Sequence, residues 1–197
     1  MTQVFDENGV CHPATIVRVS PLTVTQVRDE STDGYAAVQV ATGEQKEHRI
    51  NKAEKGHFKQ AFKHVKEFRP RKNYEESVAD FSAGQTIDAS VFAPGDMVIV
   101  SAVSKGKGFQ GVVKRHGFAG ASSASHGTKH TLRAPGSIGA TGPARVFKGT
   151  RMAGRMGSDR VTVKNLQVLQ GDGGENFLLV KGAVPGRKGS VVEVRNV

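Results

Sequence analysis

Eleven lysine and arginine side chains between Ser104 and Arg160 could act together, and the chemistry they favour is the binding of phosphate groups. This window of 57 residues holds one acidic residue, Asp159, so its formal charge is +10. Ammonium and guanidinium groups neutralise phosphates and release counterions, and arginine adds planar, bidentate hydrogen bonding. We therefore expect phosphate contacts from Lys105, Lys107, Lys114, Arg115, Lys129, Arg133, Arg145, Lys148, Arg151, Arg155 and Arg160.

The rest of the chain carries no net charge, because it holds 17 basic and 17 acidic residues. The whole excess of +10 therefore belongs to the window, which also contains twelve of the 24 glycines. Glycines let a backbone turn and approach a partner closely. A merely solvated linker is usually rich in Glu, Ser or Pro rather than free of acids. The pattern predicts a polyanionic partner, either nucleic acid or an anionic membrane surface.

Three histidines in the window, His116, His126 and His130, add groups that stack on bases or hydrogen-bond to phosphate and 2′-hydroxyl oxygens. A zinc site is the alternative, since two of them are four residues apart. A zinc protease motif needs Glu after the first histidine, where this chain has Gly127. A structural zinc site would need several cysteines, and the chain has one. We expect RNA contacts and no metal.

The stretch Gly106–Gly111 matches the pattern GxGxxG, which suggests a dinucleotide site. That fold needs a following apolar helix and an acidic residue about 20 positions on. No Asp or Glu occurs between Asp96 and Asp159, and no carboxylate is available to orient His126 beside its neighbouring serines. Paired carboxylates for acid–base catalysis are also missing from the window. We expect no cofactor and no enzymatic activity.

The elements that position these residues are mostly strands. Eight segments alternate or run apolar at strand length, are rich in Val, Ile, Thr and Phe, and are separated by Gly, Pro and Asp turns. Closely spaced short strands favour a small barrel or a sandwich. The predicted strands are Ala14–Val19, Leu22–Val27, Tyr35–Ala41, Thr86–Phe92, Met97–Val103, Val161–Leu169, Asn176–Val184 and Ser190–Val197.

One helix is also predicted. Asn51 can cap its start with Glu54 three residues on, and Pro70 lies beyond its end. The apolar residues at helical spacing are Phe58, Ala61, Phe62 and Val65. The basic residues of its other face are Lys55, Lys59, Lys63 and Lys66. Such a face is more often solvated than bound, with RNA contact as the alternative.

Together these patterns predict a mainly β protein, with a small β-barrel domain, one or two helices and a long irregular basic extension. We place the globular domain at residues 1–103 and 161–197 and the extension at residues 104–160. The extension has few large apolar residues, so burial cannot offset the entropy of ordering it, and it should be mobile until it binds. Because predicted strands flank it on both sides, it is an excursion from the β domain rather than a tail.

Cys11 is the only cysteine, which excludes an intramolecular disulfide and indicates a reducing compartment. The N-terminus lacks the apolar run of a signal peptide, and no apolar stretch reaches the length of a membrane span. We therefore expect a cytoplasmic protein whose polyanionic partner is a nucleic acid, with neither a membrane nor a small-molecule substrate involved.

An ordered series of motifs runs through the window and beyond it. The motifs are Ser104-Lys-Gly-Lys-Gly-Phe-Gln-Gly111, Lys114-Arg115, Ser125-His126-Gly127, Arg133-Ala-Pro-Gly-Ser-Ile-Gly139, Arg145-Val-Phe-Lys-Gly149, Met152-Ala-Gly-Arg-Met-Gly157, Arg160-Val-Thr-Val163 and Leu178-Leu-Val-Lys-Gly-Ala-Val-Pro-Gly186. This series resembles the bacterial type of the universal large-subunit ribosomal protein three family. The resemblance covers nearly the whole chain and is far more specific than any single motif.

The resemblance implies a β-barrel domain with a long extension that threads into the RNA of the large ribosomal subunit. In the family the extension approaches the peptidyl transferase centre, and the protein binds early in subunit assembly beside neighbouring ribosomal proteins. No catalytic residue is implied, because the peptide-bond chemistry belongs to RNA. Residues from Lys105 through Arg160 then become rRNA contacts, with the tip of the extension near Ile138–Arg145.

The chain departs from the family pattern at two places. Family members begin with a short strand that ends in Met-Thr, whereas this chain starts at Met1-Thr2, so the first barrel strand is expected to be missing. Some bacterial members carry a methylated glutamine near the tip. The stretch from Gly139 to Arg145 has no glutamine and is one residue short, so that modification is not expected.

Two other functions stay open from the residues alone. One is a free-standing nucleic-acid chaperone with a basic disordered loop, which would bind RNAs indiscriminately. The other is an enzyme that uses the GxGxxG turn to hold a phosphate, which would bind nucleotides saturably.

Overall fold

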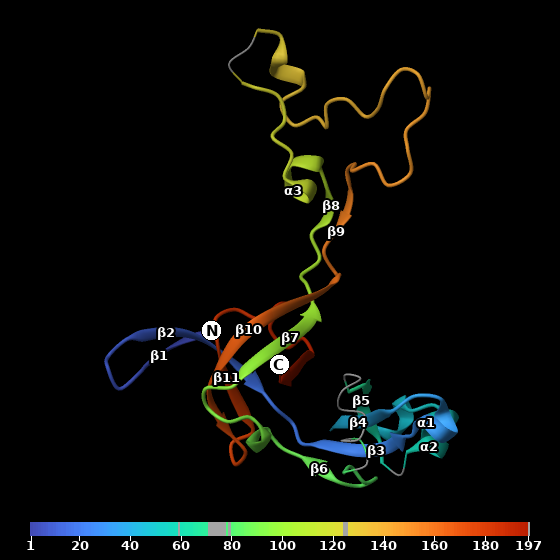
Figure 1. Cartoon of the computed structure of the whole chain (residues 1–197), viewed down its shortest axis with the longest axis vertical. Coiled ribbons are helices and arrows are strands. Elements are labelled where there is room, and N and C mark those ends of the chain that lie inside the picture. Colours follow the sequence, from blue (N-terminus) through green and yellow to red (C-terminus); the bar gives the residue numbers. More distant parts are fainter. Residues whose placement is uncertain (59, 71–77, 79, 124–125, 197) are drawn as a thin grey trace. The chain divides into compact units, whose positions relative to one another are not determined.

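The computed structural model describes residues 1–58, 60–70, 78, 80–123 and 126–196, which are mainly β, as expected (Figure 1). The strands are β1 (Thr2–Phe5), β2 (Cys11–Arg18), β3 (Leu22–Arg28), β4 (Ala37–Glu44), β5 (Phe62–Phe68), β6 (Thr86–Ile87), β7 (Met97–Val103), β8 (Gly108–Gln110), β9 (Gly154–Met156), β10 (Arg160–Asp172), β11 (Phe177–Lys181) and β12 (Val192–Asn196). The α-helices are α1 (Glu30–Asp33), α2 (Lys52–His57) and α3 (Val112–His116). Single 3₁₀ turns cover Glu47–Arg49, Ala89–Val91 and Thr128–His130. None of the helices in this described part is long and apolar enough to cross a membrane.

The strands form three sheets. Their hydrogen-bonded orders are β1-β2-β11-β10-β7-β12, β5-β4-β3-β6 and β8-β9. The six-stranded sheet has β1 and β12 at its edges, and no closed barrel is found among the described residues. By contacts the chain divides into two compact units. Unit one is formed mainly by Met1–Val98 and Asn165–Ala183, and unit two by Ile99–Lys164 and Val184–Arg195.

Unit one is built on buried aliphatic residues of its strands. Ala14, Val168, Leu178 and Val180 are fully buried on β2, β10 and β11. On the four-stranded sheet, Val24, Val38 and Val40 form a core with Val78, against which Leu22, Val27, Ala36, Phe68, Phe81 and Ile87 pack. Burying a side chain of this kind contributes about 1.5–3 kcal/mol. The apolar residues that predicted strands here therefore supply the core, as consecutive buried residues on β4 and β11.

The predicted helix is correct at its start and wrong beyond His57. Asn51 Oδ1 accepts a hydrogen bond from Glu54 N at 2.7 Å, and Glu54 Oε2 accepts one from Asn51 N at 3.2 Å, which is the expected capping box. After six residues the helix ends, with Phe58 as its C-cap, and Phe62 and Val65 belong to β5, where Val65 pairs with Ala41 of β4. Pairing with a buried strand outweighs a weak helix that already contains Gly56.

The four lysines expected on one helical face are therefore separated. Lys55 lies on α2, whereas Lys63 and Lys66 lie on β5. Lys59 falls outside the described residues. Because no single helix carries Lys55, Lys63 and Lys66, the basic helical face is a wrong prediction.

The segment Thr86–Phe92 is the other wrong element. Only Thr86 and Ile87 are paired, with Thr23 and Leu22 of β3. The chain then turns through the 3₁₀ residues Ala89–Val91, with Ala89 1% exposed. The apolar pattern in this segment therefore reflects one buried turn rather than a continuous strand.

Candidate nucleic-acid interface

The basic window begins and ends in a narrow two-stranded ribbon. β8 and β9 pair antiparallel, with Gly108 opposite Met156, Phe109 opposite Arg155 and Gln110 opposite Gly154. Figure 1 shows these strands side by side, with α3 and two loops beyond them. We call residues 104–110 and 154–160 the neck. Sequence patterns gave no indication of this ribbon, because each strand is three residues long and lacks apolar alternation.

The neck continues below β8 and β9 through further backbone contacts. Lys107 N donates to Met156 O at 3.0 Å, and Ser104 N donates to Asp159 O at 2.9 Å. Asp159 N in turn donates to Ser104 Oγ at 3.3 Å. Asp159, the single acidic residue of the window, thus helps to hold the neck through its backbone N–H and carbonyl groups. It lies at the end of the basic segment.

Glycines allow the two neck segments to approach each other. Gly157 is buried and has a φ of +79°, and a Cβ built there would lie 2.2 Å from Lys105 O. A Cβ on Gly106 would lie 3.0 Å from Ser158 Oγ. A side chain at Gly157 would therefore force the neck apart. Gly106, the first glycine of the GxGxxG pattern, lies in this neck segment, and its one close neighbour is the Ser158 hydroxyl.

Arg115 and His116 are both predicted RNA contacts. In the structure their side chains contact a backbone oxygen near the other end of the window. They lie at the end of α3, which buries Val112 and ends at Gly117 in the left-handed conformation. Arg115 Nη1 donates to Met152 O at 2.7 Å, and His116 Nε2 lies 3.0 Å from the same oxygen. Both side chains are half-buried. The structure therefore gives them an internal role in joining α3 to the chain before β9.

Arg160, the last residue of the neck, is paired with an acidic residue that lies outside the basic window. Its Nη1 and Nη2 donate to Glu193 Oε1 and Oε2 on β12 at 2.7 and 2.5 Å. These hydrogen bonds raise the pKa of the Arg160 guanidinium. Arg195 Nη2 lies 3.7 Å from the same carboxylate. Part of the charge of Arg160 is thus neutralised inside the protein.

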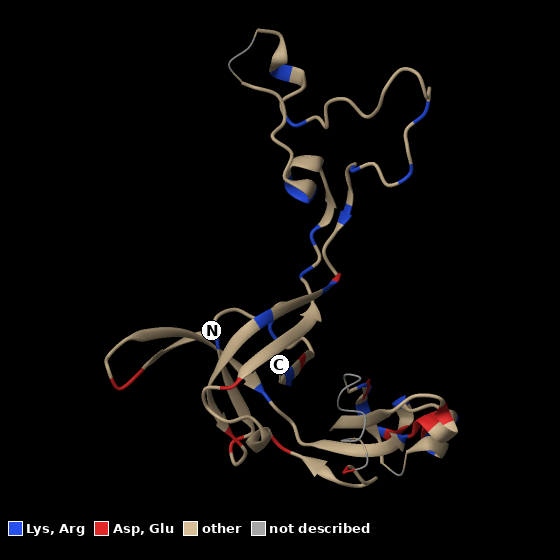
Figure 2. Ribbon diagram, viewed as in Figure 1, with Lys and Arg blue, Asp and Glu red and all other residues tan. Residues whose placement is uncertain are grey.

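The other predicted contact residues are exposed on the neck and the loops beyond it. Towards the described residues their side chains form no hydrogen bond or ion pair, so their polar groups are available to a partner. Figure 2 shows Lys and Arg along the whole segment. These residues are Lys105, Lys107, Lys114, His126, Lys129, His130, Arg133, Arg145, Lys148, Arg151 and Arg155.

One small loop brings three of these residues together. Ala121 N donates to Leu132 O at 3.2 Å, which closes the loop that holds His126, Lys129 and His130. Gly120 has a φ of +73°, and a Cβ there would lie 2.1 Å from Leu132 O, so the closure requires glycine. Ser125, quoted among the motifs, lies outside the described residues. No cluster of three or more His, Cys, Asp or Glu that could hold a metal occurs in the described part of the chain.

Sequence reasoning missed basic residues that the fold adds to the window. Arg187 and Lys188 are exposed in the turn before β12, and that turn lies against the end of β7, because a Cβ on Gly186 would be 3.1 Å from Val103 O. With Lys164 and Arg195, unit two holds fifteen Lys or Arg and two acidic residues, a formal charge of +13. Unit one and the last residues hold 13 basic and 16 acidic residues, or −3. Only strand pairing could have revealed this grouping.

Comparisons with known proteins agree with this geometry. A model of the family described as Ribosomal protein L3 matches residues 71–176, which is more than half of the chain and includes the whole neck. A protein of Clavibacter michiganensis called "Large ribosomal subunit protein uL3" is 50% identical over 201 aligned residues, covering 100% of this chain and 90% of that relative. The chain belongs to the ribosomal protein L3 family. The resemblance carried by the motif series is thereby confirmed.

Relatives with the same printed name occur in other bacteria. The ribosomal protein L3 relative of Acidothermus cellulolyticus is 50% identical over 200 residues, covering 99% of this chain and 87% of its own length. That of Trichormus variabilis is 47% identical over 199 residues, covering 98% of this chain and 91% of its own length. The L3 similarity therefore extends over both units and is not restricted to the basic window.

Proposed function

We propose that this chain is a structural constituent of the large ribosomal subunit that binds large-subunit rRNA through unit two. The observation that carries the proposal is the segregation of charge, +13 on unit two against −3 on the remainder. Eleven exposed basic or histidine side chains that have no hydrogen bond or ion pair to the described residues follow the neck and its loops. Such an arrangement suits a dense phosphate field, and membership of the ribosomal protein L3 family supplies the partner.

The RNA contacts we propose are of two kinds. The exposed side chains of the neck and loops contact phosphates, sugars and bases directly, and Arg187 and Lys188 extend this surface. Arg115, His116 and Arg160 already have protein partners, so we assign them the task of fixing the backbone that presents the others. Because internal bonds occupy only part of each guanidinium, further contact with RNA is compatible with this role.

The division of the chain follows the same reasoning. We propose a globular domain of residues 1–103 and 161–197 and an rRNA-threading extension of residues 104–160, with the tip near Ile138–Arg145. The neck supports this division, because residues 104 and 159 are hydrogen-bonded at the base of the extension. For the globular domain we also propose a small barrel. The 13-residue length of β10 and its bulge between Val168 and Gln170 support it, since bulges bend strands as barrels require.

The biological setting follows from the family. We propose a cytoplasmic protein, located in the ribosome, that joins the subunit early and supports its architecture near the peptidyl transferase centre beside neighbouring ribosomal proteins. Family membership indicates a structural protein rather than an enzyme. No observation favours the nucleotide-binding alternative. Within the GxGxxG stretch, residues 108–110 form β8, which pairs with β9 in the neck.

Two measurements test the proposal. Large subunits purified on a gradient should contain one copy of the full chain each; a clearly sub-stoichiometric amount would indicate the free-standing chaperone instead. In vitro, the affinity for large-subunit rRNA should fall with salt. If about six phosphates are contacted, the slope of log K against log salt should be near −4.

A matched pair of variants locates the charge that matters. Lys148→Gln, in an exposed loop of unit two, should reduce the magnitude of the salt slope by about 0.7–0.9. Lys63→Gln, on exposed β5 of unit one, should leave the slope unchanged. Equal effects of the two substitutions would contradict RNA binding through unit two.

A further inference from the structure

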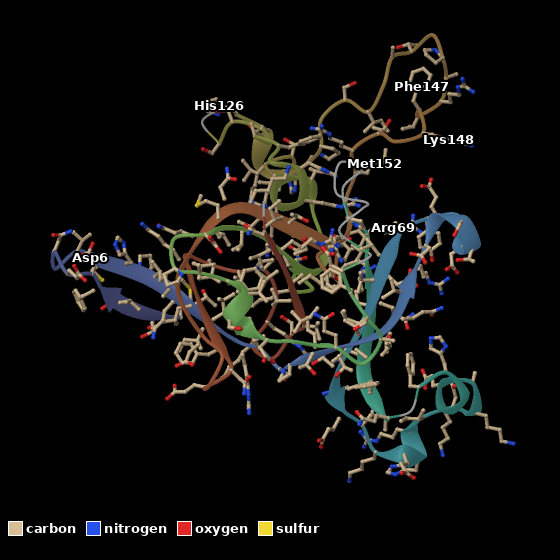
Figure 3. The ribbon with its side chains drawn as sticks, turned by 60° about the horizontal axis from the view of Figure 1, so that its bottom comes forward. Asp6, Arg69, His126, Phe147, Lys148 and Met152 are labelled. Atoms are coloured by element: carbon tan, nitrogen blue, oxygen red, sulfur yellow. The ribbon has the colours of Figure 1, made fainter. Side chains whose placement is uncertain are left out.

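Two phenylalanine rings in unit two are exposed and do not belong to the hydrophobic core. The side chain of Phe109 on β8 is 77% exposed, and that of Phe147 in the loop before β9 is 53% exposed. Figure 3 shows Phe147 beside Lys148 on that loop. Exposed apolar surface of this kind gains nothing from the hydrophobic effect in the free protein. The position of the two rings among cations therefore points to a partner that covers them.

Phe109 belongs to one face of the neck. It is directly opposite Arg155 in the β8–β9 pair, and directly opposite residues in an antiparallel pair lie on the same face. Both side chains are exposed, and Phe109 contacts no other aromatic ring within the described residues. The neck therefore presents an apolar ring and a guanidinium next to each other, which together fit a nucleobase and its phosphate.

Phe147 has a similar setting in the loop. The Arg145 guanidinium carbon lies 5.5 Å from the centroid of the Phe147 ring, and Lys148 follows in the chain. Thr150 Oγ1 donates to Phe147 O at 2.7 Å, and Thr150 N donates to the same oxygen at 3.3 Å. This turn fixes the backbone that carries the ring. The loop thus presents the ring on a local turn, with cations on both sides.

We propose that Phe109 and Phe147 stack on unpaired nucleobases of the RNA that unit two binds. Bases in an RNA duplex are covered by their neighbours, so the bases concerned belong to loops, bulges or ends. Stacking on an aromatic ring needs no particular base and is stabilised by a nearby guanidinium. The inference rests on the proposed rRNA binding and adds rings to a surface so far described by charge alone.

The remaining strongly exposed phenylalanine provides a control. Phe5 on β1 is 66% exposed, which lies between the values for Phe109 and Phe147. It is followed by Asp6 and Glu7 and belongs to unit one, where an approaching phosphate would be repelled. The same substitution at Phe5 therefore removes a similarly exposed ring from outside the proposed RNA-binding unit.

The experiment measures the affinity of the full chain for large-subunit rRNA transcribed in vitro, at several salt concentrations. Phe109→Ala and Phe147→Ala should each weaken binding by about five- to a hundredfold at every salt concentration. The salt slope should stay that of the unaltered chain, because no charge is removed. Phe5→Ala should bind like the unaltered chain. Thermal unfolding should be unchanged in all three, since the rings are exposed.

Leucine substitutions separate stacking from apolar packing. Phe109→Leu and Phe147→Leu should recover only a small part of the lost affinity, since leucine has no flat ring. Full recovery by leucine would overturn the proposal in favour of an apolar pocket. Affinities of the alanine variants equal to that of Phe5→Ala would overturn it as well, while rRNA binding itself stood. If the unaltered chain failed to bind rRNA, the proposed function would be the one to fail.

Discussion

The guanidinium of Arg115 donates a hydrogen bond to the backbone carbonyl of Met152, 37 residues later in the chain, across 2.7 Å. Gly154 makes room for it, because a Cβ at this position would lie 2.7 Å from the same Nη1 atom. A residue that composition marks as a phosphate ligand is therefore one that joins the two sides of the basic segment. Its loss should affect the order of the neck as well as its charge.

The first prediction concerns this contact. Arg115→Lys keeps the charge but lacks the planar fork that reaches Met152 O, so about 1 kcal/mol of local stability should be lost. Hydrogen exchange of the amides in β8 and β9 should become faster. Arg133→Lys, at an exposed position without a hydrogen-bond partner among the described residues, should leave this exchange unchanged. Equal exchange rates in both variants would show that the contact does not hold the neck.

The second prediction concerns the closest approach in the neck. Gly157→Ala places a methyl group 2.2 Å from Lys105 O and forces a left-handed φ of +79° on a residue with a side chain. Gly149→Ala has the same conformational cost, with a φ of +85°, but meets nothing within 4 Å. The shared cost is roughly 1–2 kcal/mol. Limited proteolysis should therefore open the neck faster in the first variant than in the second, and the reverse order would contradict the packing described.

The third prediction tests the division of the chain. Gln110 is opposite Gly154, so replacing residues 111–153 by Asn-Gly should close β8 and β9 into a two-residue hairpin. Unit one should then keep its thermal midpoint, because its buried residues lie elsewhere in the chain. Binding to large-subunit rRNA should fall sharply, because seven of the eleven basic residues of the window are removed. An unfolded variant would show that the domain boundaries are wrong.

The fourth prediction concerns the turn between β1 and β2. The hydrogen bond from Val10 N, at 2.8 Å, is the main cause that holds the pKa of Asp6 below its usual 3.8. Because the pKa of Asp6 is lowered in the folded state, the ionised carboxylate stabilises the turn at neutral pH. This stabilisation is lost as the pH falls through the pKa that Asp6 has in the folded protein. The Val10 amide shift should therefore titrate with a midpoint below 3.8. Asp6→Ala should abolish that titration; a midpoint above 3.8 would contradict the lowered pKa.

The strands that sequence patterns predicted best include two whose apolar residues are buried in the core. β3 and β7 begin at the residues expected, since Val24 and Val98 are completely buried. The helix was predicted past His57 because Phe58, Phe62 and Val65 recur at helical spacing, although on β5 the three-residue step from Phe62 to Val65 places these two side chains on opposite faces. Its partner β4, and no local signal, decides in favour of a strand.

The candidate site was predictable in its charge and not in its internal bonding. The excess of basic over acidic residues in the window can be recognised from composition alone, without knowledge of the fold. Arg160, by contrast, meets its carboxylate 33 residues away on Glu193, and the partner of Arg115 is a backbone atom that no residue type reveals. Long-range pairing of this kind depends on register, which single-sequence patterns do not contain.

The neck has a consequence for the length of what it carries. Since β8 and β9 lie side by side, the intervening chain leaves and returns at one place, and its ends stay together whatever lies between them. Doubling the length of a flexible loop costs only about 0.6 kcal/mol in closure entropy. A tag or fluorophore-bearing peptide inserted between Gly142 and Pro143 would therefore be carried without stretching either strand. Because the neck holds the two ends of the basic segment together, the length of the chain between them can change without a change in β8 or β9.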